Sequence, residues 1–262
     1  MQPVITLFGH SVQSYYLCAM LAGAAGILTG AAYLKKEFPD LRRFLIPAGL
    51  AVLAVVCARL LNYATNPDAF GSRFSLWSLR YAKLSLMGGL VSGVCAVYAL
   101  GLLTKKDPLR LLDCMTVPGA AGILLLKLGC FLNGCCFGKP TDGPFGVVFP
   151  ANEAKYRFLE SLPLVKALSP RVHPTQLYEM LGAAVSLALA LLLERKLRLK
   201  GGVRFLVFAA GFSLARLIVL PLRTLPYPDA VIRVFYPALY GAILVLCVGA
   251  LLLRVRKARR GG

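Results

Sequence analysis

The run from Tyr15 to Leu34, YYLCAMLAGAAGILTGAAYL, contains no charged residue. It has about the length of 20 residues that a helix needs to cross a bilayer. Six similar runs follow it. We therefore expect membrane-spanning helices over about residues 15–34, 44–63, 86–103, 111–133, 177–193, 203–220 and 234–253.

The composition agrees with an all-α, polytopic membrane protein. Hydrophobic residues make up 58% of the chain and charged residues 16%, whereas soluble domains are about half apolar and about a quarter charged. These values exclude an ordinary soluble enzyme, a disordered chain and a small secreted scaffold. We expect one membrane domain over residues 1–262, with the lipid bilayer as its surroundings.

The basic residues predict the orientation of the chain. The net charge of +19 lies mainly in the segments that connect the apolar runs, so it does not indicate a nucleic-acid partner. One side of the bilayer receives a dense set of cations: Lys35, Lys36, Arg42, Arg43, Lys105, Lys106, Arg110, Arg195, Lys196, Arg198, Lys200, Arg254, Arg256, Lys257, Arg259 and Arg260. The short segments on the other side hold fewer: Arg73, Arg80, Lys83, Arg223 and Arg233. Because cytoplasmic segments are rich in Lys and Arg, we expect a cytoplasmic C-terminus and an extracytoplasmic N-terminus.

The longest connecting segment, about residues 134–176, is then extracytoplasmic. Its stretch GKPTDGPFGVVFP, from Gly138 to Pro150, is rich in Gly and Pro and predicts fixed turns. A loop of this length with its own turns is typical of a functional cap. We call residues 134–176 the cap loop. The N-terminus has no basic region before its first apolar run, so we expect no cleavable signal peptide.

Three cations fall inside the apolar runs: Arg59, Lys127 and Arg216. Each is costly in the bilayer unless it is solvated or paired. No Asp or Glu lies in the core of a run, and we expect Asp113 and Glu179, near the ends, to neutralise these cations only in part. An anion from outside the protein, such as a phospholipid phosphate, is therefore the expected counter-charge.

Arg223 follows Arg216 by two helical turns, so both side chains can point to the same side if the helix continues past Pro221. A competing interpretation is that Arg59 and Arg216 extend to the membrane interface and only stabilise packing.

Three of the eight cysteines cluster, namely Cys130, Cys135 and Cys136. They are interpreted as structural thiols or as one structural disulfide, which an extracytoplasmic location permits. Metal binding is the less favoured interpretation, because no His is close in sequence and the spacing matches no known zinc pattern. We therefore expect no metal and no cofactor.

Two segments carry a resemblance to a known family. KLGCFLNGCCFGKPTDGPFGVVFP, from Lys127 to Pro150, resembles the signature of bacterial phosphatidylglycerol–prolipoprotein diacylglyceryl transferases. HPTQLYE, from His173 to Glu179, resembles a second block of that family. The resemblance implies a multi-pass protein of the bacterial plasma membrane. Its partners would be phosphatidylglycerol and the lipobox peptide of a preprolipoprotein, whose cysteine thiol receives the diacylglyceryl group.

The resemblance also implies the site residues. The expected catalytic residues are Arg216, Lys127 and Tyr16. Arg216 would hold the phosphate and Tyr16 would orient lipid or thiol, although an interfacial Tyr is also a common membrane anchor. The expected substrate-binding residues are Arg59, Gly88, Gly89, Asn133, Gly138, His173, Gln176 and Arg223. For Gly88 and Gly89 the competing interpretation is tight helix packing. For His173 we favour a structural hydrogen bond over a role as base.

The sequence departs from the family at several polar positions. Met87 replaces a histidine, Lys127 an arginine, Cys130 an asparagine, and Cys135 and Leu220 each replace a glutamate. The function that the resemblance implies is diacylglyceryl transfer, which needs no nucleophile from this chain. The alternative is a catalytically altered paralogue that binds phospholipid or lipoprotein precursor without the transfer. A weaker alternative is a thiol redox protein.

Overall fold

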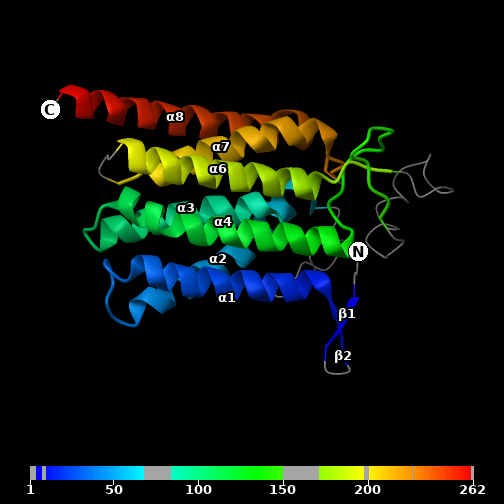
Figure 1. Ribbon diagram of the computed structural model, residues 1–262, viewed down its shortest axis with the longest axis horizontal. Coiled ribbons are helices and arrows are strands. Elements are labelled where there is room, and N and C mark those ends of the chain that lie inside the picture. Colours follow the sequence, from blue (N-terminus) through cyan, green and yellow to red (C-terminus); the bar gives the residue numbers. More distant parts are fainter. Residues whose placement is uncertain are drawn as a thin grey trace.

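The computed structural model is a bundle of long helices that run along one common direction (Figure 1). It describes residues 4–7, 10–67, 84–149, 171–197, 201–225 and 227–260. The long helices in these ranges are α1 (Ser14–Leu34), α2 (Arg42–Thr65), α3 (Leu86–Leu103), α4 (Pro108–Asn133), α6 (Thr175–Leu197), α7 (Val203–Val219) and α8 (Tyr236–Arg260). With the short turns that flank α7 and α8, all 7 are long and apolar enough to cross a membrane. The expected all-α membrane fold is confirmed.

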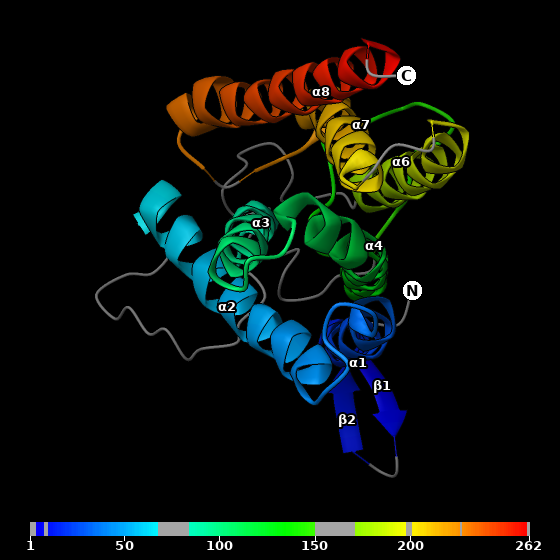
Figure 2. The same cartoon turned by 90° about the vertical axis from the view of Figure 1, so that its left-hand side faces the viewer.

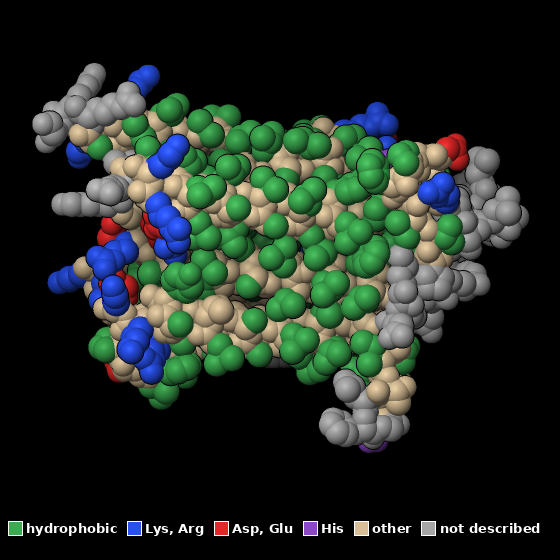
Figure 3. Space-filling view, viewed as in Figure 1, with side chains coloured by type: hydrophobic (Ala, Val, Ile, Leu, Met, Phe, Trp, Pro, Cys, Tyr) green, Lys and Arg blue, Asp and Glu red, His purple; other side chains and the backbone are tan. Residues whose placement is uncertain are grey.

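The two ends of the bundle differ. The cap loop after α4 and the hairpin of β1 (Val4–Leu7) and β2 (His10–Gln13) lie at one end, and the C-terminus lies at the other (Figure 1). The hairpin was not predicted. Apolar side chains cover the flank, and Lys and Arg gather at the end that holds the C-terminus (Figure 3). Expected basic residues at 73, 80, 83, 198 and 200, and the cap-loop segment 150–170, lie outside the described residues.

Small residues bring the helices close together. The core between α4, α6 and α7 contains Ala120, Ala183 and Ala190, each with 0% of its surface exposed, beside Phe208 and Phe212. Alanines at a helix interface let the backbones approach, which is how helices associate in lipid. Viewed along the bundle, α6, α7 and α8 form one group that faces α4 and α3, and α1 and α2 lie beyond (Figure 2).

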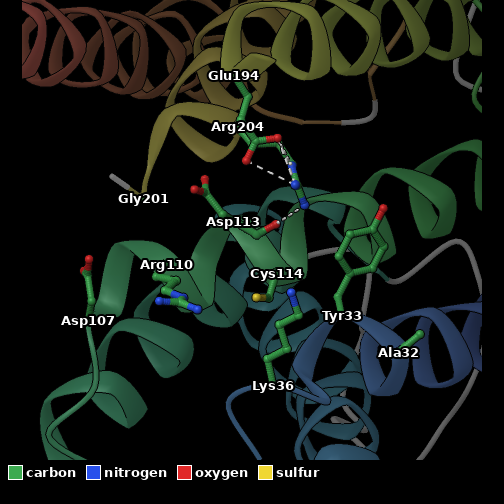
Figure 4. Close-up of a pocket in the computed structure, with 10 residues that line it drawn as sticks. All are labelled: Ala32, Tyr33, Lys36, Asp107, Arg110, Asp113, Cys114, Glu194, Gly201 and Arg204. Atoms are coloured by element: carbon green, nitrogen blue, oxygen red, sulfur yellow. Dashed lines mark hydrogen bonds and ion pairs between the residues drawn. The ribbon is translucent and has the colours of Figure 1, made fainter. Parts of the chain in front are cut away.

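At the C-terminal end, the helix ends are held by side chains from neighbouring helices. Asp113 on α4 accepts hydrogen bonds from Gly202 N (2.5 Å) and Phe205 N (2.8 Å), and so caps α7. Arg204 pairs with Glu194 at 2.8 Å and lies over the ring of Tyr33. Tyr33, Asp113, Glu194 and Arg204 line a pocket of about 700 Å³ (Figure 4). Asp113, Glu194 and Arg204 hold α4, α6 and α7 together, which indicates a structural role.

Candidate functional site

Three cations meet one carboxylate at the cap-loop end of the bundle. Glu179 on α6 lies 2.5 Å from Lys127 Nζ, 2.6 Å from Arg216 Nη1 and 2.8 Å from Arg223 Nη1. The side chain of Glu179 is 1% exposed and those of the cations are 6%, 7% and 9% exposed. We call Lys127, Glu179, Arg216 and Arg223 the Glu179 cluster. Helices α4, α6 and α7 and the turn after α7 therefore meet in one buried ionic site.

This arrangement corrects one expectation. We expected Lys127 and Arg216 to find their counter-charge outside the protein, and that expectation was wrong, because both pair with Glu179. Helix α6 begins at Thr175, so Glu179 lies in its second turn and points into the bundle rather than toward its edge. The three cations still outnumber the carboxylate, which leaves the cluster two positive charges in excess.

Tyr240 holds the other side of the Arg216 guanidinium. Its hydroxyl accepts hydrogen bonds from Nε at 3.2 Å and Nη2 at 2.7 Å, and its ring lies under the guanidinium. Tyr240 is 0% exposed on α8. No sequence pattern points to this role, because a tyrosine in the apolar run after Tyr236 cannot be distinguished from a core aromatic residue.

The start of the cap loop is tied to the start of α6. Gln176 Nε2 donates to Cys135 O at 2.6 Å, and Thr175 Oγ1 donates to Cys136 O at 2.8 Å. Gln176 is 0% exposed. Because Gln176 lies one turn before Glu179, the same helix face that carries the carboxylate also fixes the loop.

Gly138 lies where three segments cross. Its N–H donates to His173 O at 2.8 Å, and it forms an isolated β-bridge with Arg223. A Cβ here would meet Leu222 O, and would lie 2.8 Å from both His173 Cβ and Thr175 Cγ2. Only glycine fits this crossing. The role expected for Gly138 in binding is therefore accompanied by a structural one, since the crossing holds Arg223 at the cluster.

His173 takes part in the same crossing. The ring Nδ1 of His173 lies 3.3 Å from the hydroxyl of Tyr178, and its backbone N–H donates to the backbone oxygen of Lys139 at 3.1 Å. These contacts are compatible with the structural role that we favoured for His173, and that role stays a prediction.

The glycine pair on α3 packs against α2. A Cβ on Gly88 would lie 2.6 Å from Cys57 O, and one on Gly89 would lie 3.1 Å from Ala54 O. These contacts are the tight helix packing considered as the competing interpretation. The structure gives no contact of this pair with the Glu179 cluster among the described residues.

Three further expected residues lie in the membrane helices. Arg59 on α2 is 1% exposed, and Asn133 at the end of α4 is 4% exposed. Tyr16 is half-buried near the start of α1, with its ring 5.8 Å from that of Tyr15. Asn133 and Tyr16 lie at the cap-loop end of their helices, the same end as the Glu179 cluster.

Two departures from the family pattern lie together. Met87 and Leu220 are 4% and 7% exposed and belong to one apolar cluster with Tyr236 and Tyr240. Since Tyr240 also bonds Arg216, this apolar patch adjoins the Glu179 cluster. The two polar groups that the resemblance would place here are replaced by one continuous hydrophobic surface.

Cys130, Cys135 and Cys136 gather beside this site as free thiols. Their Sγ atoms all lie within 4.8 Å of one another. Hydrogen bonds from Cys130 and Cys135, together with the positive charge of Lys127, hold the pKa of the Cys136 thiol well below its usual value. The pKa of Cys135 is raised by its hydrogen bonds to the other two thiols and by burial.

Comparisons with known proteins identify the family. The family model for prolipoprotein diacylglyceryl transferase matches residues 3–255. A Ruegeria pomeroyi protein named phosphatidylglycerol–prolipoprotein diacylglyceryl transferase is 35% identical over 160 residues, which are 60% of this chain and 50% of that protein. Proteins of the same name from Photorhabdus laumondii and Clostridium tetani are 33% identical over 180 residues and 26% identical over 235 residues.

The extent of these matches differs. The Photorhabdus match covers 65% of this chain and 59% of the relative, and the Clostridium match covers 85% and 86%. The chain thus spans 50% and 59% of the length of the Ruegeria and Photorhabdus relatives. The family model spans nearly all residues of this chain, so the chain belongs to the prolipoprotein diacylglyceryl transferase family.

Proposed function

We propose that this chain transfers the diacylglyceryl group of phosphatidylglycerol to the cysteine thiol of a preprolipoprotein. In this reaction the sulfur forms a bond to the terminal carbon of the diacylglyceryl group. The bond between that carbon and the phosphate oxygen breaks, and glycerol phosphate leaves with the electron pair. The observation that supports the proposal most directly is the excess positive charge of the Glu179 cluster.

The cluster is suited to hold the phosphate. An arginine guanidinium matches the geometry of phosphate oxygens and stays charged at all relevant pH values. Arg223 Nε is buried and has no hydrogen-bond partner among the described residues, so it is available as a donor. Lys127 adds a point charge. As the C–O bond breaks, charge grows on the phosphate, and fixed cations in a site with little water stabilise that charge strongly.

The difference in charge between the two ends of the bundle supports an orientation. Lys and Arg gather at the C-terminal end, as Figure 3 shows, and we propose that this end is cytoplasmic. The Glu179 cluster and the cap loop would then face the outside of the bacterial plasma membrane, where a lipoprotein precursor arrives. We further propose that the cap loop covers the reacting groups and excludes water, within one membrane domain.

The remaining expected residues complete the proposed site. Tyr16, Asn133 and Gln176 would contact lipid or peptide near the start of the cap loop, and Arg59 would contribute positive charge from α2. Gly138 and His173 would shape the loop. For Gly88 and Gly89 we propose only close packing beside the lipid path, given their contacts with α2.

Complementation tests this proposal. A bacterium depleted of its own diacylglyceryl transferase should grow when it expresses this chain and should not grow with Arg216→Ala. Arg256→Ala is the matched control, because Arg256 is exposed on α8 at the opposite end. Absence of rescue by the wild-type chain, at membrane levels equal to those of a rescuing transferase, would favour the catalytically altered paralogue instead.

A further inference from the structure

Three thiols meet where α4 ends and the cap loop begins. The Sγ atoms of Cys130, Cys135 and Cys136 lie within 4.8 Å of one another. Thiolates on one zinc ion at about 2.3 Å lie roughly 3.8 Å apart in tetrahedral geometry. A shift of about 1 Å or less at each side chain would therefore place all three on one ion.

The backbone that carries the thiols is fixed from several sides. Cys135 N donates to Cys130 O at 3.0 Å, and Gln176 and Thr175 hold the carbonyls of Cys135 and Cys136. Cys136 has φ of 61°, a left-handed conformation that a residue with a Cβ adopts only when its surroundings enforce it. The thiols are thus arranged before any ligand arrives, as a metal site requires.

The charge of the neighbourhood matches such a site. Three thiolates on a divalent cation carry one net negative charge. Lys127 precedes Cys130 by one turn of α4, and Glu179 follows Gln176 by one turn of α6, so the Glu179 cluster adjoins the thiols. The net positive charge of that cluster favours an anionic metal complex beside it.

The proposed reaction needs a thiolate, because the thiolate and not the thiol is the nucleophile. The described residues around the cluster offer no good proton acceptor. Glu179 is held as an anion by three cations, and the ring of His173 is engaged through Nδ1 with the hydroxyl of Tyr178. A metal ion supplies the missing activation, because a coordinating thiol is deprotonated outright.

We propose that Cys130, Cys135 and Cys136 bind one zinc ion, and that the lipobox cysteine of the substrate occupies its fourth position. This inference rests on the proposed function. Cys130 and Cys135 are buried at 7% and 6% exposure, whereas Cys136 is exposed, so the fourth position faces the side open to a peptide. Zinc sites that act on a substrate keep one position for it beside three protein ligands.

The lipobox thiol releases its proton to water when its sulfur binds zinc. That sulfur then attacks the diacylglyceryl carbon, the C–O bond breaks, and the electron pair leaves on the phosphate oxygen of glycerol phosphate. Arg216 and Arg223 hold the departing anion. The product is a neutral thioether, which binds zinc weakly and dissociates.

Metal analysis of the purified full chain tests the site. We expect about one zinc ion per wild-type chain and per Cys95→Ser chain, and about tenfold less for Cys136→Ser. Cys95 is the matched control because it is an exposed cysteine on α3, outside the cluster. Equal zinc in Cys136→Ser, or a disulfide among the three cysteines of the protein taken from membranes, would overturn the inference. Since Cys136 is exposed, its serine variant is the least disruptive of the three.

Cobalt substitution tests the role of the fourth position without relying on activity. Co²⁺ added to the metal-free wild-type chain should give sulfur-to-metal charge-transfer absorption. A lipobox peptide should alter the visible cobalt bands, and the same peptide with serine in place of cysteine should not. Identical spectra with both peptides would overturn the substrate role.

Transfer assays separate this inference from the proposed function. Transfer by the metal-free chain or by Cys136→Ser at the wild-type rate would overturn the zinc role and leave the transferase proposal intact. The visible cobalt bands could change with the cysteine peptide and not with the serine peptide, while the zinc-loaded chain shows no transfer. That outcome would support the zinc site and contradict the transferase proposal.

Discussion

Arg216 Nη1 lies 2.6 Å from Glu179 Oε1, and the same guanidinium donates through Nε and Nη2 to the hydroxyl of Tyr240. Its partners come from two other helices, α6 and α8, so its plane is fixed before a substrate enters. A fixed guanidinium loses little freedom when it binds phosphate, and this preorganisation is what catalysis by charge stabilisation requires.

Removing the Tyr240 hydroxyl should loosen that guanidinium. Tyr240→Phe loses two hydrogen bonds to a charged group, each worth about 1.5–3 kcal/mol, while it keeps the ring under Arg216. We expect kcat for diacylglyceryl transfer to fall about tenfold or more, with a smaller change in KM. Steady-state kinetics with phosphatidylglycerol measures both constants. Tyr98→Phe, on the exposed face of α3, should keep the wild-type values.

Glu179 should matter for stability as well as for activity. Glu179→Gln leaves three buried cations without a counter-charge, and breaking a buried ion pair in this way costs about 3–5 kcal/mol. We expect a clear fall in the thermal unfolding temperature in detergent. Glu37→Gln is the control, because Glu37 pairs with the more exposed Lys106 and Arg110 at the other end. Equal unfolding temperatures for the two variants would show that Glu179 is not the centre of the site.

The sequence predicted the fold more completely than the site. Apolar runs predicted seven spans, because the bilayer imposes length and composition on each helix. Periodicity could not show that Glu179, near the start of its run, points inward to meet Lys127 and Arg216. Pairing across α4, α6 and α7 depends on helix rotation, which a single sequence does not specify. Tyr240 was missed for the same reason.

The tight packing around Gly138 predicts that a larger residue there lowers both activity and stability. Gly138→Ala would place a Cβ against Leu222 O and 2.8 Å from His173 Cβ. Such overpacking costs about 1–3 kcal/mol, and it would also displace Arg223 from the Glu179 cluster. We expect loss of transfer together with a lower unfolding temperature. Gly93→Ala on α3 has no atom within 4 Å of its added Cβ and should leave transfer unchanged. Full activity of Gly138→Ala would contradict the packing described here.

The Cys136 thiol should titrate at lower pH than an ordinary cysteine thiol in the metal-free chain. Its pKa is lowered by hydrogen bonds from Cys130 and Cys135 and by the charges of Lys127 and Arg223, so more of it is thiolate at a given pH. We expect alkylation of Cys136 by a water-soluble iodoacetamide to persist at lower pH than alkylation of an ordinary cysteine thiol. Cys130→Ala, which removes one of these hydrogen-bond donors, should move this profile to higher pH. Mass spectrometry of the modified chain follows the reaction, and a profile centred near pH 8.5 would contradict the lowered pKa.

The spacing of the three cysteines in the sequence does not show that their sulfurs lie close together. Cys130 lies on the last turn of α4, and Cys135 and Cys136 follow the left-handed Gly134 that ends the helix. This turn folds the chain back so that the three sulfurs meet, although their spacing matches no known zinc pattern. The sequence interpretation of structural thiols had no means to weigh that geometry.

The most direct test of the central claim measures transfer by the purified chain in a defined system. The assay follows the labelled diacylglyceryl group from phosphatidylglycerol vesicles to a lipobox peptide. Wild-type chain and Arg256→Ala should transfer the group at equal rates, and Arg216→Ala should be about 100-fold slower, as for the loss of one main charge-stabilising group. Equal rates for Arg216→Ala and Arg256→Ala would contradict the assignment of the Glu179 cluster as the phosphate site.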